Sequence, residues 1–218
     1  MSRSPSQGRI FAVGDIHGQL AKLEALLTRI DPDPARDELV FLGDYVDRGP
    51  DSRGVVQRLI DLAQGELSAS FLRGNHEQML LDYVLGGKNR DLYLFNGGLS
   101  TLEGYARPGQ NPLSARPPVE HLAFLTGLKL FLRRPGTIFV HAGLRPGRPL
   151  KDQEPRDLLW IREEFFQAEH DWPERIVFGH TPFQEPFRKG KLFGLDTGAA
   201  YGGPLTCLVL PEEEIIQI

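Results

Sequence analysis

Residues 9–30 read RIFAVGDIHGQLAKLEALLTRI and contain a short β-rich run, a polar turn and a helical pattern in succession. The β-rich run ends at Gly14. From residue 19 to residue 30, leucine and isoleucine recur at steps of three and four, which places them on one face of a helix. Asp31 is followed by a proline, and the residue before a proline is disfavoured in helical backbone. The stretch therefore predicts a strand, a turn and an amphipathic helix.

The same order of strand, glycine and helix recurs further along the chain. Residues 38–42 and 69–72 form the next two β-rich runs, with a helical pattern over residues 54–63 between them. Gly43 and Gly74 mark the ends of these runs, each beside charged residues. This rhythm is typical of β-α-β units in a parallel sheet, whose strand carboxyl ends carry the chemistry.

Residues 86–118 interrupt the rhythm, because they are rich in glycine, proline, serine and asparagine. A short helix is expected at residues 91–95. We interpret the segment as an elaborated connection rather than a linker, since too little chain lies on either side for two independent cores. Beyond it, the patterns predict helices and then a β-rich end. The helices are expected at residues 119–128 and 156–168, and the strands at residues 137–140, 176–178, 192–195 and 205–210.

The chain has 218 residues, so we expect residues 1–8 to be a flexible start and residues 9–218 to form one domain. A formal net charge of −4 argues against a nucleic-acid partner. No run approaches the ~20 apolar residues that a membrane span needs, and the polar N-terminus lacks the apolar core of a signal peptide. A single cysteine, Cys207, cannot support a disulfide framework. We therefore expect a cytoplasmic protein without a membrane partner.

Five motifs that combine carboxylate, amide or imidazole side chains fall at the ends of expected strands. They are Gly14-Asp15-Ile16-His17-Gly18, Gly43-Asp44-Tyr45-Val46-Asp47-Arg48-Gly49, Gly74-Asn75-His76-Glu77, Val140-His141-Ala142-Gly143 and Phe178-Gly179-His180-Thr181-Pro182. Oxygen donors mixed with imidazole suit a first-row divalent ion such as Mn, Fe or Zn. Asp-x-His by itself is also compatible with a helix cap beside a surface histidine. Five such motifs, each after a strand, instead predict one metal-phosphate site.

These blocks, in this order, resemble the phosphoprotein phosphatase branch of the binuclear metallophosphoesterases. The nearest type is the short bacterial and phage serine/threonine phosphatases. The likeness runs from about residue 11 to the end of the chain and is weakest over residues 86–118. It implies an α/β fold with a four-layer αββα sandwich, in which two sheets pack face to face with helices outside, as a single domain.

The resemblance also implies two divalent metal ions, with Mn2+ as the first choice and Fe or Zn as alternatives. Asp15 and His17 would bind the first ion, and Asp44 would bridge the two. The second ion would be completed by Asn75, His141 and His180.

Further residues would act on the substrate, according to the same resemblance. His76 would donate a proton to the leaving oxygen, with Asp47 orienting its ring. Arg48 would hold phosphate oxygens through its planar guanidinium.

A second arginine is also expected at the phosphate. Arg162, in Trp160-Ile161-Arg162, matches its position in the short bacterial members and is preferred to Arg145. Tyr201 could line the site, since relatives carry a tyrosine after the last motif.

The function implied is that of a metal-dependent serine/threonine protein phosphatase, which hydrolyses phosphomonoesters by in-line attack of a metal-bridging hydroxide. Its partners would be phosphorylated proteins or peptides and small phosphoesters. The alternative is a symmetrical diadenosine tetraphosphate hydrolase, a type that is usually longer, so the compact length favours the protein phosphatase. If residues 86–118 form the rim of the cleft, they would set the leaving group. A catalytically silent protein that binds phosphorylated partners is a third hypothesis, although such proteins usually lose ligands.

Several other polar residues are interpreted as structural. His121 lies on an expected helix, and His170 is expected to be solvated near a helix end. Asp196, in Asp196-Thr197-Gly198, is expected to follow a strand and turn the chain near the metals. Cys207 is expected to be a small buried residue rather than a reactive thiol. The run of three glutamates at residues 212–214 is expected to form a solvated turn or edge.

Overall fold

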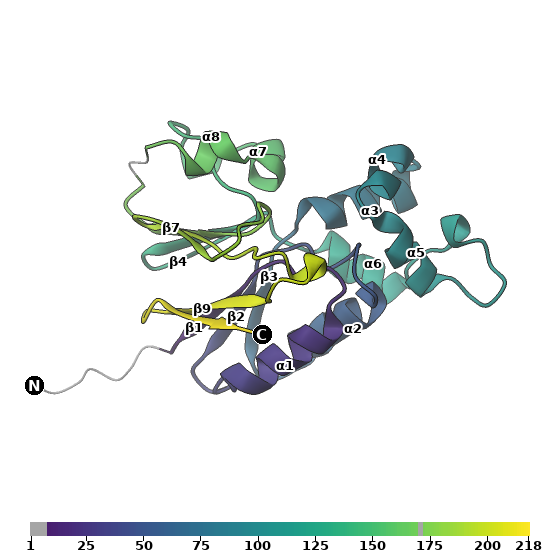
Figure 1. The fold of residues 1–218 in the computed structure, drawn as a ribbon, viewed down its shortest axis with the longest axis horizontal. Helices are drawn as coiled ribbons and strands as arrows, with labels where there is room; N and C mark the ends of the chain where they lie inside the picture. The colour runs from purple at the N-terminus through teal and green to yellow at the C-terminus, as the bar shows by residue number, and fades with distance from the viewer. Residues whose placement is uncertain (1–7, 170–171) are drawn as a thin grey trace, which may run out of the picture.

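Two five-stranded sheets form the centre of the computed structural model, which describes residues 8–169 and 172–218 (Figure 1). The first sheet has the order β10-β9-β1-β2-β3. Its strands are β1 (Ile10–Val13), β2 (Glu38–Phe41), β3 (Ser68–Phe71), β9 (Thr206–Leu210) and β10 (Glu214–Gln217). The second sheet has the order β4-β5-β6-β8-β7. Its strands are β4 (Phe131–Arg134), β5 (Thr137–Val140), β6 (Arg175–Phe178), β7 (Phe187–Lys189) and β8 (Leu192–Gly194).

Helices cover the outer face of each sheet (Figure 1). The first sheet is covered by α1 (Leu20–Ile30) and α2 (Ser52–Gln64), and the second by α7 (Pro155–Trp160) and α8 (Glu163–Phe166). The layers therefore run helix, sheet, sheet, helix, and the expected four-layer αββα architecture is confirmed. The remaining α-helices extend from one end of the sandwich. They are α3 (Asn75–Gly86), α4 (Arg90–Phe95), α5 (Gly98–Tyr105) and α6 (Val119–Thr126). Short 3-10 turns lie at η1 (Pro112–Ser114), η2 (Leu150–Asp152) and η3 (Ala199–Tyr201).

Three apolar cores separate the four layers. In β1, Phe11 and Val13 face the helices of the first sheet, whereas Ala12 faces the second sheet, because successive side chains of a strand point to opposite faces. Phe139 and Val177 meet Ala12 in the layer between the sheets. A strand that is buried on both faces has a continuous run of apolar residues in its sequence. Such runs are the reason why these strands could be predicted from the sequence.

The carboxyl ends of the parallel strands meet at one edge of the sandwich. Strands β1, β2 and β3 are mutually parallel neighbours, and so are β5, β6 and β8. Each of these six strands runs directly into a polar loop. The shared direction therefore brings together side chains that lie up to about 180 residues apart, for example Asp15 and Asp196.

Several local expectations need correction. The helix expected over residues 156–168 is two short helices, because Ile161 is extended (ψ 144°) and Arg162 is non-helical (φ −130°, ψ −111°). The sequence patterns missed the edge strands β4, β7 and β10 and the helix α5, and they indicated a helix after Gly74 (α3) without giving its bounds. Strands β4 and β7 carry two basic residues each, and α5 contains two glycines. None of these three elements therefore shows a strong periodic pattern of apolar residues.

Other expectations concern single residues. His121 is buried and lies between the Tyr105 hydroxyl (2.7 Å) and the Gln57 side chain (3.1 Å), which agrees with a structural role. Cys207 is buried, and burial raises the pKa of its thiol, as expected for an unreactive residue. Glu213 lies in the turn before β10, but it forms ion pairs with Arg175 and Arg188 instead of being free in solvent. Residues 1–7 and His170 lie outside the described residues.

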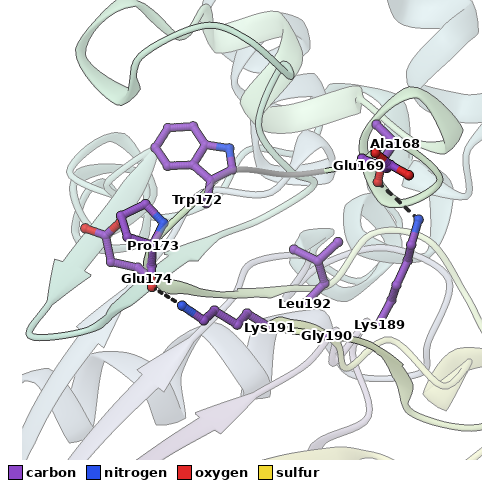
Figure 2. Close-up of a pocket in the computed structure, with 9 residues that line it drawn as sticks. All are labelled: Ala168, Glu169, Trp172, Pro173, Glu174, Lys189, Gly190, Lys191 and Leu192. Atoms are coloured by element: carbon purple, nitrogen blue, oxygen red, sulfur yellow. Dashed lines mark hydrogen bonds between the residues drawn. The ribbon is translucent and has the colours of Figure 1, made fainter.

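No helix among the residues that the structure describes combines the length and the apolar character that crossing a bilayer requires. A hollow of about 590 Å³ lies beside the β7–β8 hairpin (Figure 2). Lys189 and Lys191 line it, but both ammonium groups donate to backbone carbonyls, at 2.7 Å to Gln167 and 2.5 Å to Pro173. None of the sequence-predicted site residues lines this hollow, so the site lies elsewhere.

Candidate metal centre

The turn between β1 and α1 orients His17 toward the strand edge. The backbone N–H groups of Ile16 and His17 both donate to the carbonyl of Asp44, at 3.0 and 2.8 Å. The Nδ1–H of His17 donates to the Val46 carbonyl at 2.8 Å. The lone pair of the other ring nitrogen, Nε2, is therefore directed away from the backbone and toward Asp44 and Arg48, where it would be available to a cation.

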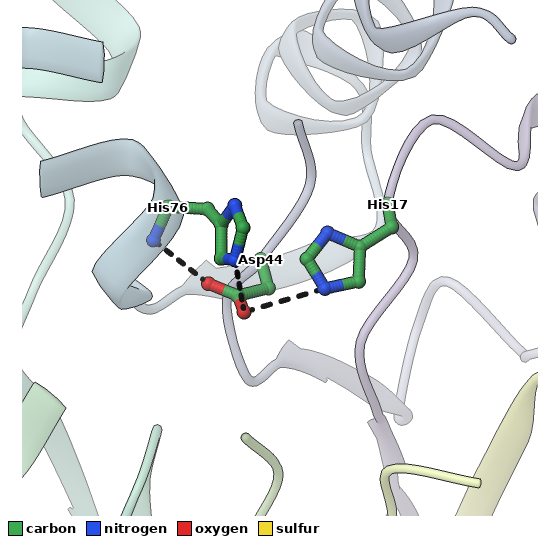
Figure 3. A group of neighbouring side chains, drawn as sticks. All are labelled: His17, Asp44 and His76. Carbon is green, nitrogen blue, oxygen red and sulfur yellow. Dashed lines mark hydrogen bonds and ion pairs between the residues drawn. The ribbon is translucent and has the colours of Figure 1, made fainter. Parts of the chain in front are cut away.

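Asp44 lies between the side chains of the first group (Figure 3). Its carboxylate is 3.4 Å from His17 Nε2 and 4.0 Å from His76 Nε2. The backbone N–H of His76, at the start of α3, donates to the same carboxylate at 3.1 Å. A Cβ on Gly74 would lie 2.1 Å from Asp44 Oδ1, so only glycine permits this approach.

A second group of donors lies on the other side of Asp44. His141 Nε2 is 3.4 Å from the Asp44 carboxylate. Asn75 Oδ1 is 2.9 Å from both His141 Nε2 and His180 Nδ1. The donor atoms form two sets, His17/Asp44/His76 and Asp44/His141/His180. Within each set, the donor atoms all lie within 4.8 Å of one another. Asp44 belongs to both sets, which is the position that a bridging ligand would take.

Asp15 contacts the backbone of His180, a member of the second group. Its carboxylate oxygens accept from the His180 backbone N–H at 3.2 and 3.0 Å. A Cβ on Gly179 would lie 2.1 Å from Asp15 Oδ1. The sequence predicted that Asp15 and His17 share one ion, and this pairing stays a prediction; the compact donor set around His17 contains Asp44 and His76.

The charge balance of the centre favours cations. Burial raises the pKa of Asp15 well above its usual value, and the neighbouring Asp196 and Asp44 raise it further. Burial also raises the pKa of Asp196 to about 6. Three buried carboxyl groups therefore converge, and positive charge placed among them would relieve their repulsion.

The histidines of the centre are held in the neutral form that binds metals. Burial lowers the pKa of His17 to about 3 and lowers the pKa of His141 and His180. His141 donates through Nδ1 to the Leu42 carbonyl at 3.0 Å, so its Nε2 lone pair faces the Asn75 oxygen 2.9 Å away. Two facing lone pairs repel unless they share a cation. Within the described residues, the buried Nε2 atoms of His76 and His180 also have no hydrogen-bond partner. These donors fit a binuclear metal centre.

His76 and Asp47 form a buried pair beside the donors. His76 Nδ1–H donates to Asp47 Oδ2 at 2.7 Å. Burial would lower the pKa of His76, but the carboxylates of Asp44 and Asp47 outweigh it and raise that pKa. The imidazole is therefore disposed to carry a proton, with Nε2 on the side of the metal donors.

Two hydroxyl groups that were not predicted from the sequence as part of the site donate hydrogen bonds to the Asp47 carboxylate. Tyr93 and Thr101 both donate to Asp47 Oδ1, at 3.0 and 2.7 Å. They come from α4 and α5, inside the segment whose sequence was least informative. No local pattern marks them, because 46 and 54 residues separate them from Asp47.

Glu77 is a further residue whose part the sequence did not define. Its carboxylate accepts from the backbone N–H groups of Asp44, Tyr45 and Gly74, at 2.9, 2.7 and 2.8 Å. Burial raises the pKa of Glu77 to about 7. The contacts tie the loop after β2 to the start of α3, so Glu77 fixes the backbone on which Asp44 and Asn75 stand.

The backbone of the centre is strained in a consistent way. Of the eight described non-glycine residues with left-handed φ, five are sequence-predicted site residues. They are His17 (45°), Asp44 (53°), Asp47 (71°), Arg48 (68°) and His180 (64°). Such conformations cost energy and persist where the surrounding hydrogen bonds impose them, which is common at functional sites.

Arg48 lies on the first-sheet side of the centre. Its guanidinium donates to His17 Nε2 at 2.5 Å and lies over the ring of Tyr201, with 5.3 Å between the guanidinium carbon and the ring centroid. The Arg48 backbone N–H donates to the Gly97 carbonyl at 3.2 Å. Tyr201 is 67 % exposed, so its ring lies at the mouth of the site.

The two candidates for the second arginine differ in their contacts. Arg145 forms a double hydrogen bond with Asp157, at 2.6 and 3.1 Å, and lies 3.6 Å from Glu164. Arg162 forms no ion pair with any other described residue. Burial lowers the pKa of His141 and His180, and the charge of Arg162 lowers both further, so its guanidinium lies near the centre.

Loss of Arg162 is therefore expected to damage activity more than loss of Arg145. A charge-assisted hydrogen bond contributes about 1.5–3 kcal/mol, so Arg162→Ala should lower kcat/KM by about 10- to 100-fold. Arg145→Ala removes a partly exposed ion pair and should leave kcat/KM nearly unchanged. Steady-state kinetics of the two variants measure the difference. A larger loss in Arg145→Ala would mean that Arg145 is the phosphate ligand.

Comparison with known proteins agrees with this geometry. The family model described as calcineurin-like phosphoesterase matches residues 8–205. The chain belongs to the calcineurin-like phosphoesterase family. Members use a binuclear metal centre, and the two donor sets that share Asp44 are able to bind one. The resemblance predicted from the five motifs is therefore confirmed at the level of the family, and the chain is a phosphoester hydrolase.

Individual relatives in the family differ in the substrate that their names record. The chain is 33 % identical over 207 residues to serine/threonine-protein phosphatase 1 of Salmonella typhimurium strain LT2, covering 90 % of this chain and 89 % of that protein. It is 30 % identical over 233 residues to an asymmetrical bis(5'-nucleosyl)-tetraphosphatase of Geobacillus sp. strain WCH70, covering 96 % and 94 %. A solved structure assigned provisionally as a diadenosine tetraphosphatase matches with a TM-score of 0.77 and 30 % identity, over 99 % of this chain and 95 % of that one.

These relatives limit what the length of the chain says about its substrate. The compact length favours a protein phosphatase over a symmetrical diadenosine tetraphosphate hydrolase. The chain covers 94 % of the asymmetrical Geobacillus enzyme, so length does not separate a protein phosphatase from an asymmetrical hydrolase. The nucleotide relatives are also named as asymmetrical rather than symmetrical hydrolases.

Proposed function

We propose that this phosphoesterase is a metal-dependent protein phosphatase that removes phosphate from serine and threonine side chains. The observation that carries the proposal is the buried His76–Asp47 pair, with 2.7 Å between His76 Nδ1 and Asp47 Oδ2. An alkoxide of serine or threonine is a poor leaving group and needs a proton as its bond to phosphorus breaks. A nucleoside polyphosphate leaves as a stable phosphate anion and needs none. A dedicated proton donor therefore suits a phosphomonoester of an alcohol.

The residues of this chain would divide the work as follows. Asp15, His17, Asp44, Asn75, His141 and His180 would hold two divalent cations. When bound, the cations would lower the pKa of a water for in-line attack and offset the charge of the phosphate.

Arg48 and Arg162 would hold the phosphate oxygens from two sides. His76, oriented by Asp47, would transfer its Nε2 proton to the leaving oxygen. The 33 % identity to the Salmonella serine/threonine phosphatase, over nine-tenths of the chain, supports the same substrate class.

A second candidate is asymmetrical hydrolysis of dinucleoside tetraphosphates. Two partly exposed aromatic rings flank the centre, which supports it. Trp160 lies 6.1 Å from the ring of His180, and Tyr201 lies over the Arg48 guanidinium. Aromatic faces at a phosphate site can stack with a nucleobase. A silent phosphate-binding protein has less support, since every expected donor and the His76–Asp47 pair are in place.

Turnover of competing substrates tests the proposal. Protein stripped with a chelator should be inactive, and Mn2+ should restore hydrolysis of phosphoserine and phosphothreonine peptides. We expect kcat/KM for these peptides to exceed that for diadenosine tetraphosphate, and Trp160→Ala to change the peptide value little. Preferred release of ATP and AMP from the dinucleotide, with a large loss in Trp160→Ala, would instead establish the second candidate. Stoichiometric metal binding without turnover of any phosphoester would leave only the silent protein.

A further inference from the structure

The carboxylate of Asp47 has a separate partner for each of its oxygens. Oδ2 accepts from His76 Nδ1 at 2.7 Å, while Oδ1 accepts from the hydroxyls of Tyr93 (3.0 Å) and Thr101 (2.7 Å). Asp47, Tyr93 and Thr101 are all 0 % exposed. The Thr101 oxygen also accepts from the backbone N–H of Asp47 at 2.8 Å, and so does the Ser52 hydroxyl at 3.0 Å. Water is excluded from the carboxylate, and its rotation is blocked from both ends.

One segment of the chain supplies these contacts and also supports Arg48. Tyr93 lies on α4 and Thr101 on α5, and the Gly97 carbonyl between them accepts from the Arg48 backbone N–H. Asp47 and Arg48 are consecutive residues with left-handed φ of 71° and 68°. The α4–α5 segment therefore forms hydrogen bonds both to Asp47, which orients His76, and to Arg48, the next residue along the chain.

We propose that Tyr93 and Thr101 are positioning residues that orient His76, through Asp47, for proton transfer to the leaving oxygen. This inference rests on the proposed function. In the reaction, the water oxygen forms a bond to phosphorus and releases a proton to solvent. The bond from phosphorus to the leaving oxygen breaks, and that oxygen keeps the electron pair and takes the Nε2 proton of His76. His76 then regains a proton from solvent.

The hydroxyls matter because an unrestrained carboxylate could rotate and turn the imidazole with it. Two donors on Oδ1 keep Oδ2 facing Nδ1, and Nε2 then keeps its direction toward the centre. Loss of a donor would misdirect the proton. The resulting defect should depend on how much the leaving oxygen needs that proton, so alkyl phosphates should suffer more than 4-nitrophenyl phosphate, whose phenolate leaves readily.

Tyr93→Phe is the direct test, because it removes only the hydroxyl and keeps the ring that packs against Tyr83 and Gly98. Tyr83→Phe is the matched control. Its ring stacks on that of Tyr93 at 5.4 Å, but its hydroxyl donates to the Leu113 carbonyl at 2.7 Å and does not contact Asp47. Thr101→Val provides a second variant that removes the other hydroxyl at nearly constant volume.

The experiment compares kcat and KM of the full-length Mn2+-loaded proteins on phosphoserine peptide and on 4-nitrophenyl phosphate. Tyr93→Phe and Thr101→Val should each lower kcat on the peptide by about 10-fold or more, and on 4-nitrophenyl phosphate by less than about threefold, with KM and metal content retained. Tyr83→Phe should match wild type on both substrates.

Three outcomes with the variants would overturn the inference alone. An equal loss on both substrates would indicate a merely structural role, and so would the same pattern in Tyr83→Phe. Unchanged kcat in both Tyr93→Phe and Thr101→Val would show that the hydroxyls are dispensable. These results would leave the proposed function intact. A wild-type protein that hydrolyses dinucleotide but not phosphopeptide would overturn the proposed function, and the inference with it.

Discussion

His76→Asn is expected to lower kcat on a phosphoserine peptide by about 100- to 10,000-fold, the usual contribution of a positioned proton donor. Asparagine occupies a similar volume and can still accept or donate hydrogen bonds, but it cannot transfer a proton near neutral pH. The backbone N–H of residue 76, which donates to Asp44 at 3.1 Å, is retained in the variant. Steady-state kinetics with bound metal determined in parallel measures the effect.

His121→Asn is the matched control for this prediction. His121 is also buried and hydrogen-bonded through both ring nitrogens, but its partners are Tyr105 and Gln57 on the helical side of the first sheet. Its replacement should affect stability rather than kcat. A His76→Asn protein that keeps its metal and retains wild-type kcat would exclude His76 as the proton donor. Loss of metal in that variant would indicate that His76 is a ligand, as its place in the donor set around His17 allows.

Gly179→Ala is expected to abolish most activity through the metal donors, although position 179 carries no functional side chain. The added Cβ would lie 2.1 Å from Asp15 Oδ1, so the carboxylate or the backbone after β6 must move. The same carboxylate accepts from the His180 N–H, so the shift would reach His180 as well. A displacement of about 1 Å at a catalytic centre can cost 100-fold in rate, and we expect at least that loss together with reduced metal binding.

Gly104→Ala separates this effect from the general cost of adding a methyl group. In α5, the nearest atom to a new Cβ at position 104 is Arg53 Cβ at 3.9 Å, an ordinary contact. Alanine in a helix is also preferred to glycine by roughly 0.5–1 kcal/mol, so this variant should be active and slightly more stable. Metal content and thermal unfolding of both variants provide the measurement. Full metal binding in Gly179→Ala would contradict the close approach of Asp15 to this glycine.

The sequence by itself identified the five motifs whose side chains the structure brings together, and the family resemblance supplied their predicted roles. The donors follow β1, β2, β3, β5 and β6 directly, and each strand is marked by a short apolar run that ends near a glycine. Because parallel strands present their carboxyl ends at one edge, local patterns were enough to predict that distant motifs converge. The four-layer architecture came from the family resemblance, since periodicity revealed only the β-α-β half and a β-rich end.

Only the tertiary structure decided the contacts that support the centre. It gave Arg162 and Arg145 different surroundings, because the break at Ile161 and the ion pair of Arg145 with Asp157 depend on packing between α7, α8 and the second sheet. It also showed that Tyr93 and Thr101 contact Asp47, although they belong to residues 86–118, which have no recognisable sequence motif. A hydroxyl that binds a carboxylate 46 or 54 residues away leaves no periodic or spacing signal. Its partner is fixed by how the helices pack, which a local pattern of residues does not encode.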